Sequence, residues 1–420
     1  MNVIIKKPIS GGTLDMISSK SLTHRALIAA ALSKGQSRII KPLLSEDTYA
    51  TIDVLSKMGI KFQINQEEII VDSNGLSLPT ETLNCNESGS TLRFLIPIAL
   101  LNEGEVTFDG KPGLRKRPLS EYISLFKQMG LQYEEISENL PLRVKGKIKS
   151  GEYHMRGDIS SQFITGLLFA LPMVDGDSKL IIDTPIESKD YVLMTIFILK
   201  KFGIDIMVKN NIFYIKGNQS YRKNDYEIPG DFSQAAFFLA AGVLGANIEL
   251  KRLDINTHQA DEKMIEFIEN MNGDIMIGNG SITAKKSKTI GQIHDLSQSP
   301  DIGPILALLC ALSEGKSEII NASRLRIKES DRITSISTEL RKLGAKITET
   351  KDGMKIQGVK TLRSCMDLDS WNDHRIVMTL AIAAIKVDGQ IRIKNAEAIN
   401  KSYPTFFEDY QKLGGVIEYE

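Results

Sequence analysis

The sequence is poor in cysteine and has no long hydrophobic run. Its three cysteines, Cys85, Cys310 and Cys365, are far apart and lack CxxC spacing, which argues against a disulfide framework and against a cysteine-based zinc site. No apolar stretch reaches membrane-spanning length. The opening segment MNVIIKKPISGG lacks the charged start, apolar run and cleavage site of a signal peptide. We therefore expect a cytoplasmic protein that does not enter a membrane.

Charge of one sign is not in excess either. Lysine plus arginine and aspartate plus glutamate each total 52, so the formal net charge is zero, and the molecule has no general attraction for nucleic acid or an anionic membrane. There is no GxxxxGK[ST] phosphate loop, HExxH, GxSxG or glycine-rich dinucleotide fingerprint after a strand. These absences count against ATP hydrolysis, zinc proteolysis, serine hydrolysis and hydride transfer. What remains is an enzyme for phosphorylated or carboxylated substrates without an evident cofactor.

One phrase recurs along the whole chain: the end of a polar helix, a small turn residue and then an alternating apolar strand. The turn glycines lie 71, 73, 70, 71 and 70 residues apart, at Gly59, Gly130, Gly203, Gly273, Gly344 and Gly414. Each repeat also contains a second helix that is apolar nearly all round, such as LTHRALIAAALSKG, which is typical of a buried helix. A short β-rich run follows each of these helices.

A chain of 420 residues is long enough to favour two or more cores over one. Six units of about seventy residues, each with two helices and roughly four strands, predict an α/β protein of two three-unit domains with buried helices beneath sheets. A solenoid of stacked repeats is the alternative, but buried helices and mixed strands favour closed globular packing.

The unusual polar residues stand at the N-terminal ends of the buried helices, which attract anions through unpaired backbone N–H groups and the helix dipole. For any single segment, capping by Ser or Asp is the simpler explanation. Two segments have a composition suited to phosphate: Lys20, Ser21 and Arg25 in one, and Ser160, Ser161 and Gln162 in the other. The segments are SSKSLTHR (18–25), ESGSTLR (87–93), DISSQF (158–163), PGDFSQ (229–234), QSPD (298–301) and WNDHR (371–375).

RIKESDRI (326–333) is the densest charged stretch, with five charged side chains in eight positions. The segment SDRITSISTELRKLG predicts an amphipathic helix that ends at Gly344 and has Ser330 or a neighbour as its cap, so RIKE lies at the mouth of the helix. A cap needs only one or two of these groups. Three basic residues among two carboxylates indicate anion clamps together with a proton-transfer group. The basic loop GKPGLRKRPL, with Arg115, Lys116 and Arg117, is by itself typical of a solvated loop.

These segments together resemble the 5-enolpyruvylshikimate-3-phosphate synthases (3-phosphoshikimate 1-carboxyvinyltransferases). Nine segments stand in the order seen in that family, from about Lys6 to the C-terminus. They are SKSLTHRALIAAAL, SEDT, LRKRPL, ISSQFITGLLFALP, GDFSQAAFFLAA, SPDIGPILALL, LRIKESDRI, WNDHRIVMTLAIAA and KSYPTFF. RIKESDRI with NDHR is a specific signature, whereas the serine pairs alone are weak. The resemblance implies a monomer of two domains, each of three βαβαββ units: residues 1–19 with 230–420, and 20–229. It places the active site in the cleft between them and requires no metal.

The reaction implied by the resemblance joins phosphoenolpyruvate to the 5-hydroxyl of shikimate 3-phosphate and releases phosphate, on the pathway to chorismate and aromatic amino acids. Addition followed by elimination needs a general acid, a general base and cations that gather two anionic substrates. In this resemblance Asp301 corresponds to the proton acceptor and Glu329 to the proton donor, and Lys20 lies close to both substrates.

The resemblance also assigns the binding residues. The residues that correspond to the family's shikimate 3-phosphate site are Lys20, Ser21, Arg25, Ser160, Ser161, Gln162, Ser188, Asp301 and Lys328, and Tyr191 corresponds to a wall of this pocket. The residues that correspond to its phosphoenolpyruvate site are Lys20, Arg117, Gln162, Arg332, Arg375 and Lys401, and Gly89 lies in a loop that closely approaches this substrate. His374 is expected to be a structural neighbour of the charged cluster.

The chain departs from the family pattern before the second buried helix. Glu87, Ser90 and Phe94 stand where Asn, Thr and Pro are common, and Arg324 stands where an uncharged residue is more usual. A carboxylate near an anion site repels the anion unless it is turned away or paired with Arg or Lys.

Three other functions fit the sequence less well. The sister enzyme that transfers the enolpyruvyl group to UDP-N-acetylglucosamine carries a reactive cysteine in the mobile loop and an Asn after the first lysine, whereas GKPGLRKRPL has no cysteine and Ser21 follows Lys20. A non-catalytic phosphate-binding protein would not need both Asp301 and Glu329. An RNA-end cyclase would need a nucleotide-modifying histidine and a more basic surface.

Overall fold

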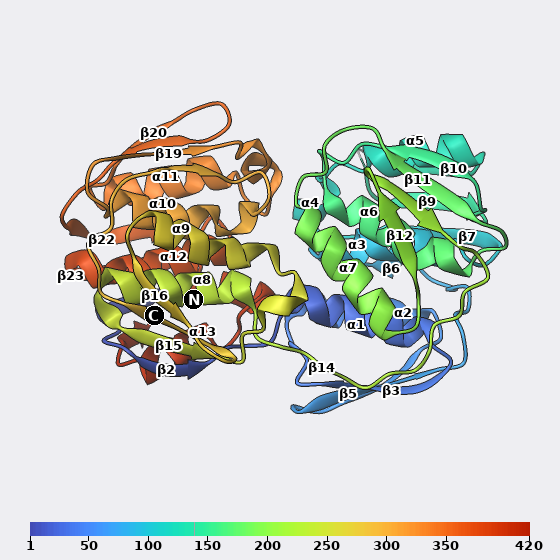
Figure 1. The fold of residues 1–420 in the computed structure, drawn as a ribbon, viewed down its shortest axis with the longest axis horizontal. Helices are drawn as coiled ribbons and strands as arrows, with labels where there is room; N and C mark the ends of the chain where they lie inside the picture. Colours follow the sequence, from blue (N-terminus) through green and yellow to red (C-terminus); the bar gives the residue numbers. More distant parts are fainter. Residues whose placement is uncertain (138) are drawn as a thin grey trace. The chain divides into compact units, whose positions relative to one another are not determined.

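The structure is a computed structural model, and it describes residues 1–137 and 139–420. The chain divides into two compact units: unit 1 comprises Met1–Ile17 and Pro229–Glu420, and unit 2 comprises Ser18–Ile228. Each unit has a hydrophobic core of its own. Figure 1 labels the helices and strands of both units.

The described residues form six four-stranded sheets that share one connection pattern. In each sheet an edge strand pairs in parallel with the second strand, and the other two pairings are antiparallel. A parallel pair needs a crossover connection. In most of the sheets one buried helix supplies it, and the result is the βαβαββ unit expected from the repeat.

The sheets of unit 1, in spatial order, have these strands: β2 (Gly12–Asp15), β15 (Ile248–Lys251), β17 (Ser281–Lys285) and β16 (Asp274–Ile277); β18 (Ile293–Asp295), β19 (Lys316–Ile320), β21 (Met354–Gln357) and β20 (Lys346–Glu349); β22 (Leu362–Asp369), β23 (Val387–Lys394), β1 (Val3–Lys7) and β24 (Val416–Tyr419). Those of unit 2 have β14 (Tyr226–Glu227), β3 (Gly35–Ile40), β5 (Glu68–Ser73) and β4 (Lys61–Ile64); β6 (Leu83–Asn84), β7 (Gly104–Asp109), β9 (Leu142–Gly146) and β8 (Gln132–Glu135); β10 (Glu152–Met155), β11 (Ser178–Ile182), β13 (Ile212–Ile215) and β12 (Ile206–Lys209).

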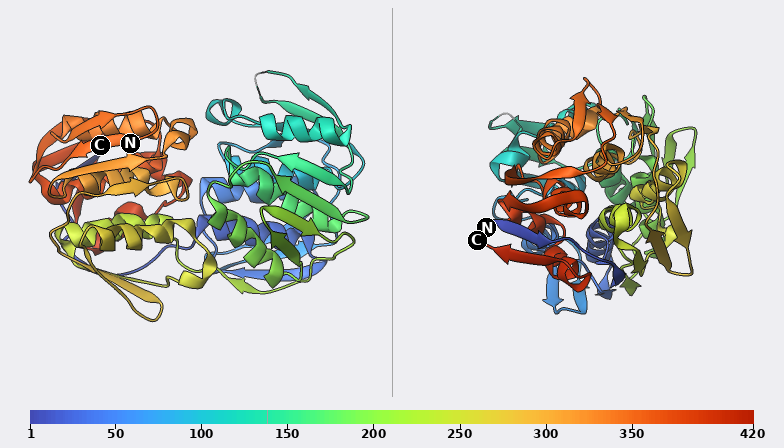
Figure 2. Two further views of the ribbon diagram at one scale, coloured as in Figure 1. Left: turned by 45° about the horizontal axis from the view of Figure 1, so that its top comes forward. Right: turned by 90° about the vertical axis from the view of Figure 1, so that its left-hand side faces the viewer.

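Three sheets are completed by strands from distant parts of the sequence, one of them by the pairing of β2 with β15. β1 lies between β23 and β24, where Ile4 is opposite both Arg392 and Glu418. β14 pairs with β3 near the opposite end of unit 2 in sequence. The chain termini are side by side in Figure 2, because Asn2 and Glu420 exchange backbone hydrogen bonds of 2.9 and 3.0 Å. The sixth unit is therefore closed by the first strand of the chain, which the repeat pattern alone did not show.

Each repeat contributes one helix that is buried nearly all round, as its composition predicted. These helices are α1 (Lys20–Leu32), α3 (Gly89–Ala99) and α6 (Ser161–Ala170) in unit 2, and α8 (Phe232–Ala241), α10 (Gly303–Ala311) and α12 (His374–Ala383) in unit 1. The more polar helices are α2 (Glu46–Lys57), α5 (Ser120–Met129), α7 (Lys189–Lys201), α9 (Lys263–Asn270), α11 (Arg332–Lys342) and α13 (Phe406–Lys412), together with the single turn α4 (Pro112–Arg115).

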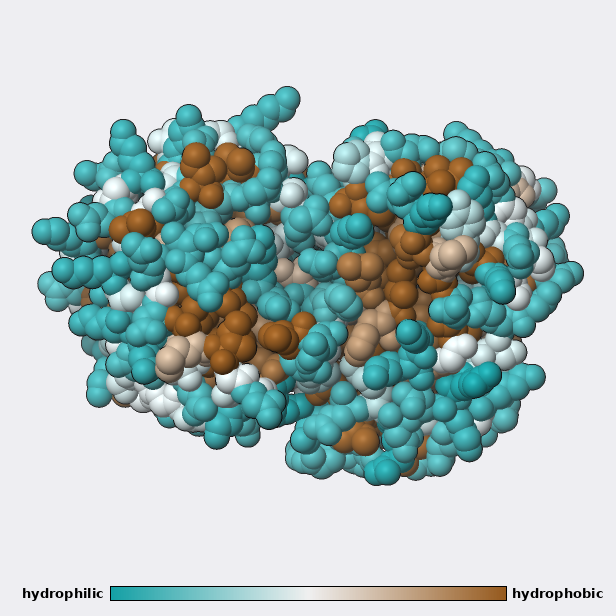
Figure 3. Space-filling model, viewed as in Figure 1, coloured by the Kyte–Doolittle hydropathy of each residue, from teal (hydrophilic) through white to brown (hydrophobic). Residues whose placement is uncertain are grey.

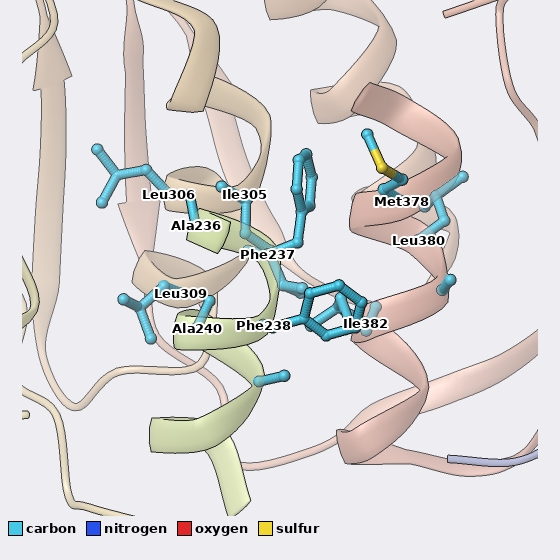
Figure 4. Close-up of a cluster of buried hydrophobic side chains, with 14 of the residues drawn as sticks. Ala236, Phe237, Phe238, Ala240, Ile305, Leu306, Leu309, Met378, Leu380 and Ile382 are labelled. Carbon is cyan, nitrogen blue, oxygen red and sulfur yellow. The ribbon is translucent and has the colours of Figure 1, made fainter. Parts of the chain in front are cut away.

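The core of unit 1 is formed where α8, α10 and α12 pack against one another. Figure 4 shows Phe237 and Phe238 of α8 between Ile305 of α10 and Met378 and Ile382 of α12, and all five side chains are fully buried. Burying each such side chain contributes roughly 1.5–3 kcal/mol. Because the three helices are held this firmly, the residues in their first turns have defined positions.

The polar helices end in left-handed turns, as the glycine spacing predicted. Gly59, Gly344 and Gly414 have φ values of 91°, 94° and 89°, a region that only glycine enters without steric cost. The fourth repeat differs: Asn272 takes the left-handed conformation with φ 61°, one residue before Gly273. Asparagine tolerates this conformation because its short side chain bonds locally.

The described helices and one face of the surface can be compared with what a membrane segment requires. No helix among the residues that the structure describes is long and apolar enough to cross a bilayer. The face seen in Figure 3 is mainly hydrophilic with separate hydrophobic patches, and exposed large hydrophobic side chains include Met207, Met276 and Ile277. Scattered exposure of this kind is ordinary for folded proteins.

Candidate active site

In unit 1, the first turn of α11 places an arginine among carboxylates. Asp331 caps the helix, since its side chain accepts hydrogen bonds from the backbone N–H groups of Ile333 and Thr334, and Arg332 follows as the first helical residue. Capping by a neighbour of Ser330 agrees with the sequence prediction. Arg332 is only 1% exposed, so its charge has to be satisfied inside the protein.

Three carboxylates satisfy the Arg332 guanidinium. Its Nε lies 2.8 Å from Asp373 Oδ2, its Nη1 lies 2.9 Å from Asp301 Oδ1 and its Nη2 lies 2.6 Å from Glu329 Oε2. Burial opposes the charge, but Asp373, Glu329 and Asp301 together raise the pKa of Arg332 above its ordinary value. The guanidinium thus holds both predicted proton-transfer carboxylates, Asp301 and Glu329, around one fixed point.

Asp301 is the most strongly paired of these carboxylates. Lys328 Nζ lies 3.1 Å from its Oδ1, and Arg375 Nη2 lies 3.6 Å from its Oδ2. Burial raises the pKa of Asp301, but the charges of Lys328, Arg375 and Arg332 outweigh this effect and hold the pKa well below its ordinary value. Burial also lowers the pKa of Lys328. Asp301 is therefore ionised at neutral pH, as a proton acceptor must be.

Lys401 and His374 lie beside the start of α12. Lys401 ends the 3-10 turn Ala396–Lys401 and donates a 2.8 Å hydrogen bond from Nζ to the carbonyl of Asn372. His374 is buried, with its Nδ1 3.8 Å from Asp373 Oδ1. Asp373 caps α12 by accepting from the Arg375 backbone N–H, so the same residue holds Arg332 and begins the helix that carries Arg375.

The charges of RIKESDRI divide into two sets. Lys328, Glu329 and Arg332 belong to the carboxylate cluster, whereas Arg326 bonds to Asp331 at 2.8 Å and to the carbonyl of Thr350 at 2.7 Å. Arg326 therefore ties the cap of α11 to the turn after β20, and it supports the cluster without belonging to it.

In unit 2, the first two turns of α1 carry the basic residues Lys20 and Arg25. Lys20 Nζ lies 2.8 Å from Asp47 Oδ2 at the start of α2. Arg25 is 2% exposed and donates to Thr195 Oγ1 and to the carbonyls of Ser21 and Tyr191, at 2.9, 2.9 and 3.0 Å. Burial lowers the pKa of Arg25 to about 9. The arginine links α1 to α7 and brings the predicted residues Ser21 and Tyr191 together.

Gly89, Arg117 and Gln162 come together although they are distant in sequence. A side-chain carbon built on Gly89 would lie 2.8 Å from Arg117 Nη1 and 3.4 Å from Gln162 Oε1, so a larger residue here would displace the Arg117 guanidinium. Arg93 donates to Gln162 Oε1 at 2.8 Å and to the carbonyl of Pro118 at 3.1 Å. By contrast, Lys116 beside Arg117 is exposed.

The predicted serines lie at helix starts. Ser160 caps α6 by accepting from the backbone N–H of Gln162, and Ser161 is the first residue of that helix and is buried. Ser188 precedes α7, is buried and has φ 55°. A non-glycine residue in this conformation is uncommon, and such strain is often found at binding sites.

Three of the four departures from the family pattern have distinct surroundings. The Ser90 hydroxyl accepts a 3.0 Å hydrogen bond from Gln162 Nε2. Phe94 lies under the Arg25 guanidinium, with 5.0 Å between the guanidinium carbon and the ring centroid. The Glu87 carboxylate approaches Gly113 of α4, so it lies against the basic-loop segment.

The sequence patterns did not single out three residues that the structure places in these groups: Asp47, Arg93 and Asp373. For Asp373 a local signal exists, since an aspartate just before a predicted helix is a typical cap. The positions of the others depend on packing between distant helices. Among the described residues, no group of three His, Cys, Asp or Glu side chains is arranged to hold a metal ion.

The repeat architecture defines the class of protein: the fold is that of the enolpyruvyl transferases. The structure of an enolpyruvyl transferase from Streptomyces tendae aligns with 100% of this chain and 98% of that chain, with a TM-score of 0.82 at 16% identity. An EPSP synthase structure from Acinetobacter baumannii aligns with 100% of this chain and 99% of that chain, with a TM-score of 0.85 at 25% identity.

Sequence comparison then defines the family. The family model described as EPSP synthase (3-phosphoshikimate 1-carboxyvinyltransferase) matches residues 5–410. A 3-phosphoshikimate 1-carboxyvinyltransferase from Clostridium novyi is 48% identical over 97% of this chain and 96% of that protein. One from Clostridium perfringens is 44% identical over 100% of this chain and 99% of that protein. The chain belongs to the EPSP synthase family and is a transferase.

Proposed function

We propose that this protein transfers the enolpyruvyl group of phosphoenolpyruvate to the 5-hydroxyl of shikimate 3-phosphate, giving 5-enolpyruvylshikimate 3-phosphate and phosphate in the pathway to chorismate. The observation that carries the proposal is the cluster in which Arg332 holds an ionised Asp301 and Glu329 together, in a chain of this family. Two carboxylates fixed at one guanidinium supply the base and the acid that addition and elimination need.

The proposed chemistry has two steps. In the addition, the 5-hydroxyl gives its proton to Asp301 and its oxygen bonds to the central carbon of phosphoenolpyruvate, while the methylene carbon takes a proton from Glu329. In the elimination the protons move in reverse: the resulting methyl group returns a proton to the Glu329 carboxylate, the double bond re-forms, and the phosphate leaves with the electrons of its C–O bond and takes the proton held by Asp301. Lys328, Arg332 and Arg375 supply positive charge around Asp301, which favours the approach of anionic substrates.

Within this proposal each unit contributes its own binding residues. The residues proposed to bind phosphoenolpyruvate are Gly89, Arg117, Gln162, Lys20, Arg332, Arg375 and Lys401. Those proposed to bind shikimate 3-phosphate are Lys20, Ser21, Arg25, Ser160, Ser161, Gln162, Ser188, Tyr191, Asp301 and Lys328. The functional domains are proposed to be residues 1–19 with 230–420 and residues 20–229. We further propose a cytoplasmic monomer that does not bind nucleic acid.

Phosphate release tests the proposal. Purified protein is given phosphoenolpyruvate with either shikimate 3-phosphate or UDP-N-acetylglucosamine, and released phosphate is measured. Release with shikimate 3-phosphate alone supports the proposal. Release with the sugar nucleotide alone would replace the acceptor, and release with neither would reject both.

A matched pair of variants tests the placement of the phosphoenolpyruvate residues. Arg117 lies against Gly89 and Gln162, whereas the neighbouring Lys116 is exposed. Arg117→Ala should raise the KM for phosphoenolpyruvate by at least about tenfold, the cost of one charge-assisted hydrogen bond. Lys116→Ala should leave it within about twofold, and equal effects would remove Arg117 from the proposed site.

A further inference from the structure

A buried carboxylate outside the proposed catalytic set is linked to Asp301 through two residues. Asp261 lies in the 3-10 turn Ala260–Glu262 and is 1% exposed. Its Oδ2 accepts a short hydrogen bond from the Ser233 hydroxyl. The Ser233 carbonyl accepts a 3.2 Å hydrogen bond from Arg375 Nη1, and Arg375 Nη2 lies 3.6 Å from Asp301 Oδ2. The chain Asp261, Ser233, Arg375, Asp301 thus joins the starts of α8, α10 and α12.

The two carboxylates of this chain have unequal partners. Burial, then the charge of Asp301, raises the pKa of Asp261 to about 6, with a smaller contribution from Asp231, and Arg375 and the Ser233 hydrogen bond oppose the rise. Asp301 has Lys328 and Arg332 in addition to Arg375. When one proton is available to the pair, it therefore resides on Asp261 and leaves Asp301 ionised.

We propose that Asp261 is a positioning residue for the reaction: by gaining or losing its own proton, it sets how strongly Asp301 attracts the proton of the substrate hydroxyl. This inference rests on the proposed function. Once Asp261 has released its proton to solvent, its negative charge opposes the charge of Asp301, so Asp301 becomes a stronger base. The same charge attracts Arg375, which the Ser233 carbonyl holds in place.

The kinetic test compares Asp261→Asn with Glu266→Gln. Asn keeps the size of the side chain and removes the charge, and Glu266 is an exposed carboxylate on the following helix. In the unmodified protein and in Glu266→Gln, kcat for phosphate release should rise as the pH passes through about 6, the value to which the pKa of Asp261 is raised. In Asp261→Asn this rise should be absent and kcat at pH 7.5 should fall about tenfold, the effect of one pKa unit on proton affinity.

The KM for phosphoenolpyruvate should change by less than about threefold in Asp261→Asn, because Arg375 keeps its bonds to Ser233 and Asp301. A merely structural role would lower activity without removing the inflection from the pH profile. An unchanged profile in Asp261→Asn would overturn the inference.

A spectroscopic titration tests the coupling without catalysis. In the full chain, the infrared C=O band of a protonated buried carboxyl should disappear as the pH is raised through about 6. The band should be absent in Asp261→Asn. In Asp301→Asn the pH at which half of the band has disappeared should fall by at least about one unit, because the negative charge of Asp301 is gone. A midpoint that does not move would overturn the inference even in a folded protein that releases no phosphate, so the outcome is separate from that of the proposed function.

Discussion

At the scale of single residues, the environment of Arg332 determines what the side chain can do. Three carboxylates surround a guanidinium that is 1% exposed, so removing it would leave Asp301, Glu329 and Asp373 close together without their shared cation. Breaking a buried ion pair by deleting one partner costs more than the pair itself contributes, because the remaining charge stays buried. Arg332 thus stabilises the folded state in addition to its proposed role as a clamp.

We predict that Arg332→Ala lowers the free energy of unfolding by roughly 3–5 kcal/mol, measured by urea denaturation at pH 7. Arg341 is the matched control: it lies on the same helix and also pairs at 2.6 Å, with Glu349, but its side chain is 44% exposed. Arg341→Ala should cost less than about 1 kcal/mol.

The cost of Arg332→Ala should also depend on pH. Arg332 and its neighbours hold the folded-state pKa of Asp301 below its ordinary value, so this contribution to stability is present above the unfolded pKa of about 4 and is lost as the pH falls below it. The difference between the two proteins should therefore shrink on acidification. An equal loss for Arg332→Ala and Arg341→Ala would contradict the prediction.

At the scale of elements, two polar side-chain contacts, one helical turn apart, join α1 and α2. Lys20 pairs with Asp47 at 2.8 Å, and His24 Nδ1 lies 2.8 Å from Thr51 Oγ1. The Thr51 hydroxyl continues at 2.7 Å to Thr91 in the first turn of α3. The starts of α1, α2 and α3 are thus aligned by one buried network, and α1 and α3 carry proposed binding residues.

This network makes the stability of unit 2 sensitive to acid. Burial, followed by the nearby charges of Lys20 and Arg25, lowers the pKa of His24 to about 3, and Asp47 only partly opposes the shift. The folded state therefore binds the proton more weakly than the unfolded state, and the stability gained by keeping His24 neutral is complete above about pH 6.5. Between about 6.5 and 3 it is lost as the pH falls.

We predict that replacement of His24 by Asn removes this part of the acid dependence. The free energy of unfolding of the unmodified protein should decrease, through His24, by about 1.4 kcal/mol per pH unit below about pH 6, and His24→Asn should lack that slope. His258→Asn is the control, since His258 is exposed on a left-handed turn that Asn tolerates. Parallel pH curves for the unmodified protein and His24→Asn would refute the role of His24.

At the scale of the whole molecule, the two units differ in how the chain completes them. Unit 2 is the continuous segment Ser18–Ile228, whereas unit 1 needs both Met1–Ile17 and Pro229–Glu420. The short N-terminal segment supplies β1, which is an inner strand of its sheet, and β2, which is the parallel edge strand of another. Without β1, the backbone groups of β23 and β24 that face it would lose their partners.

We predict that residues 18–228 produced alone fold and unfold cooperatively in urea, whereas residues 229–420 alone do not. A permuted chain in which a short Gly/Ser linker joins Glu420 to Met1, and which ends at residue 17, should restore folding of unit 1, because Asn2 and Glu420 are already hydrogen-bonded. Circular dichroism and urea titration provide the measurement. Cooperative unfolding of 229–420 without the N-terminal segment would show that β1 is dispensable.

The sequence alone determined the parts of this protein that depend on local patterns. The spacing of the turn glycines identified six repeats, and helices apolar all round were predicted to be buried, because periodicity and composition are read within a few turns of chain. The sequence also predicted a functional cluster of charged residues around Asp301 and Glu329, since several charges close together at the start of a helix have few structural roles.

Only the tertiary structure decided which distant groups meet. The placement of β1 between β23 and β24 depends on strand pairing across the whole chain, and the sharing of Arg332 among Asp301, Glu329 and Asp373 depends on how α10, α11 and α12 pack. Asp261 is likewise linked to Asp301 only through Ser233 and Arg375. Burial and Coulomb interactions act through space, so neither these partners nor their proton affinities are contained in a local pattern.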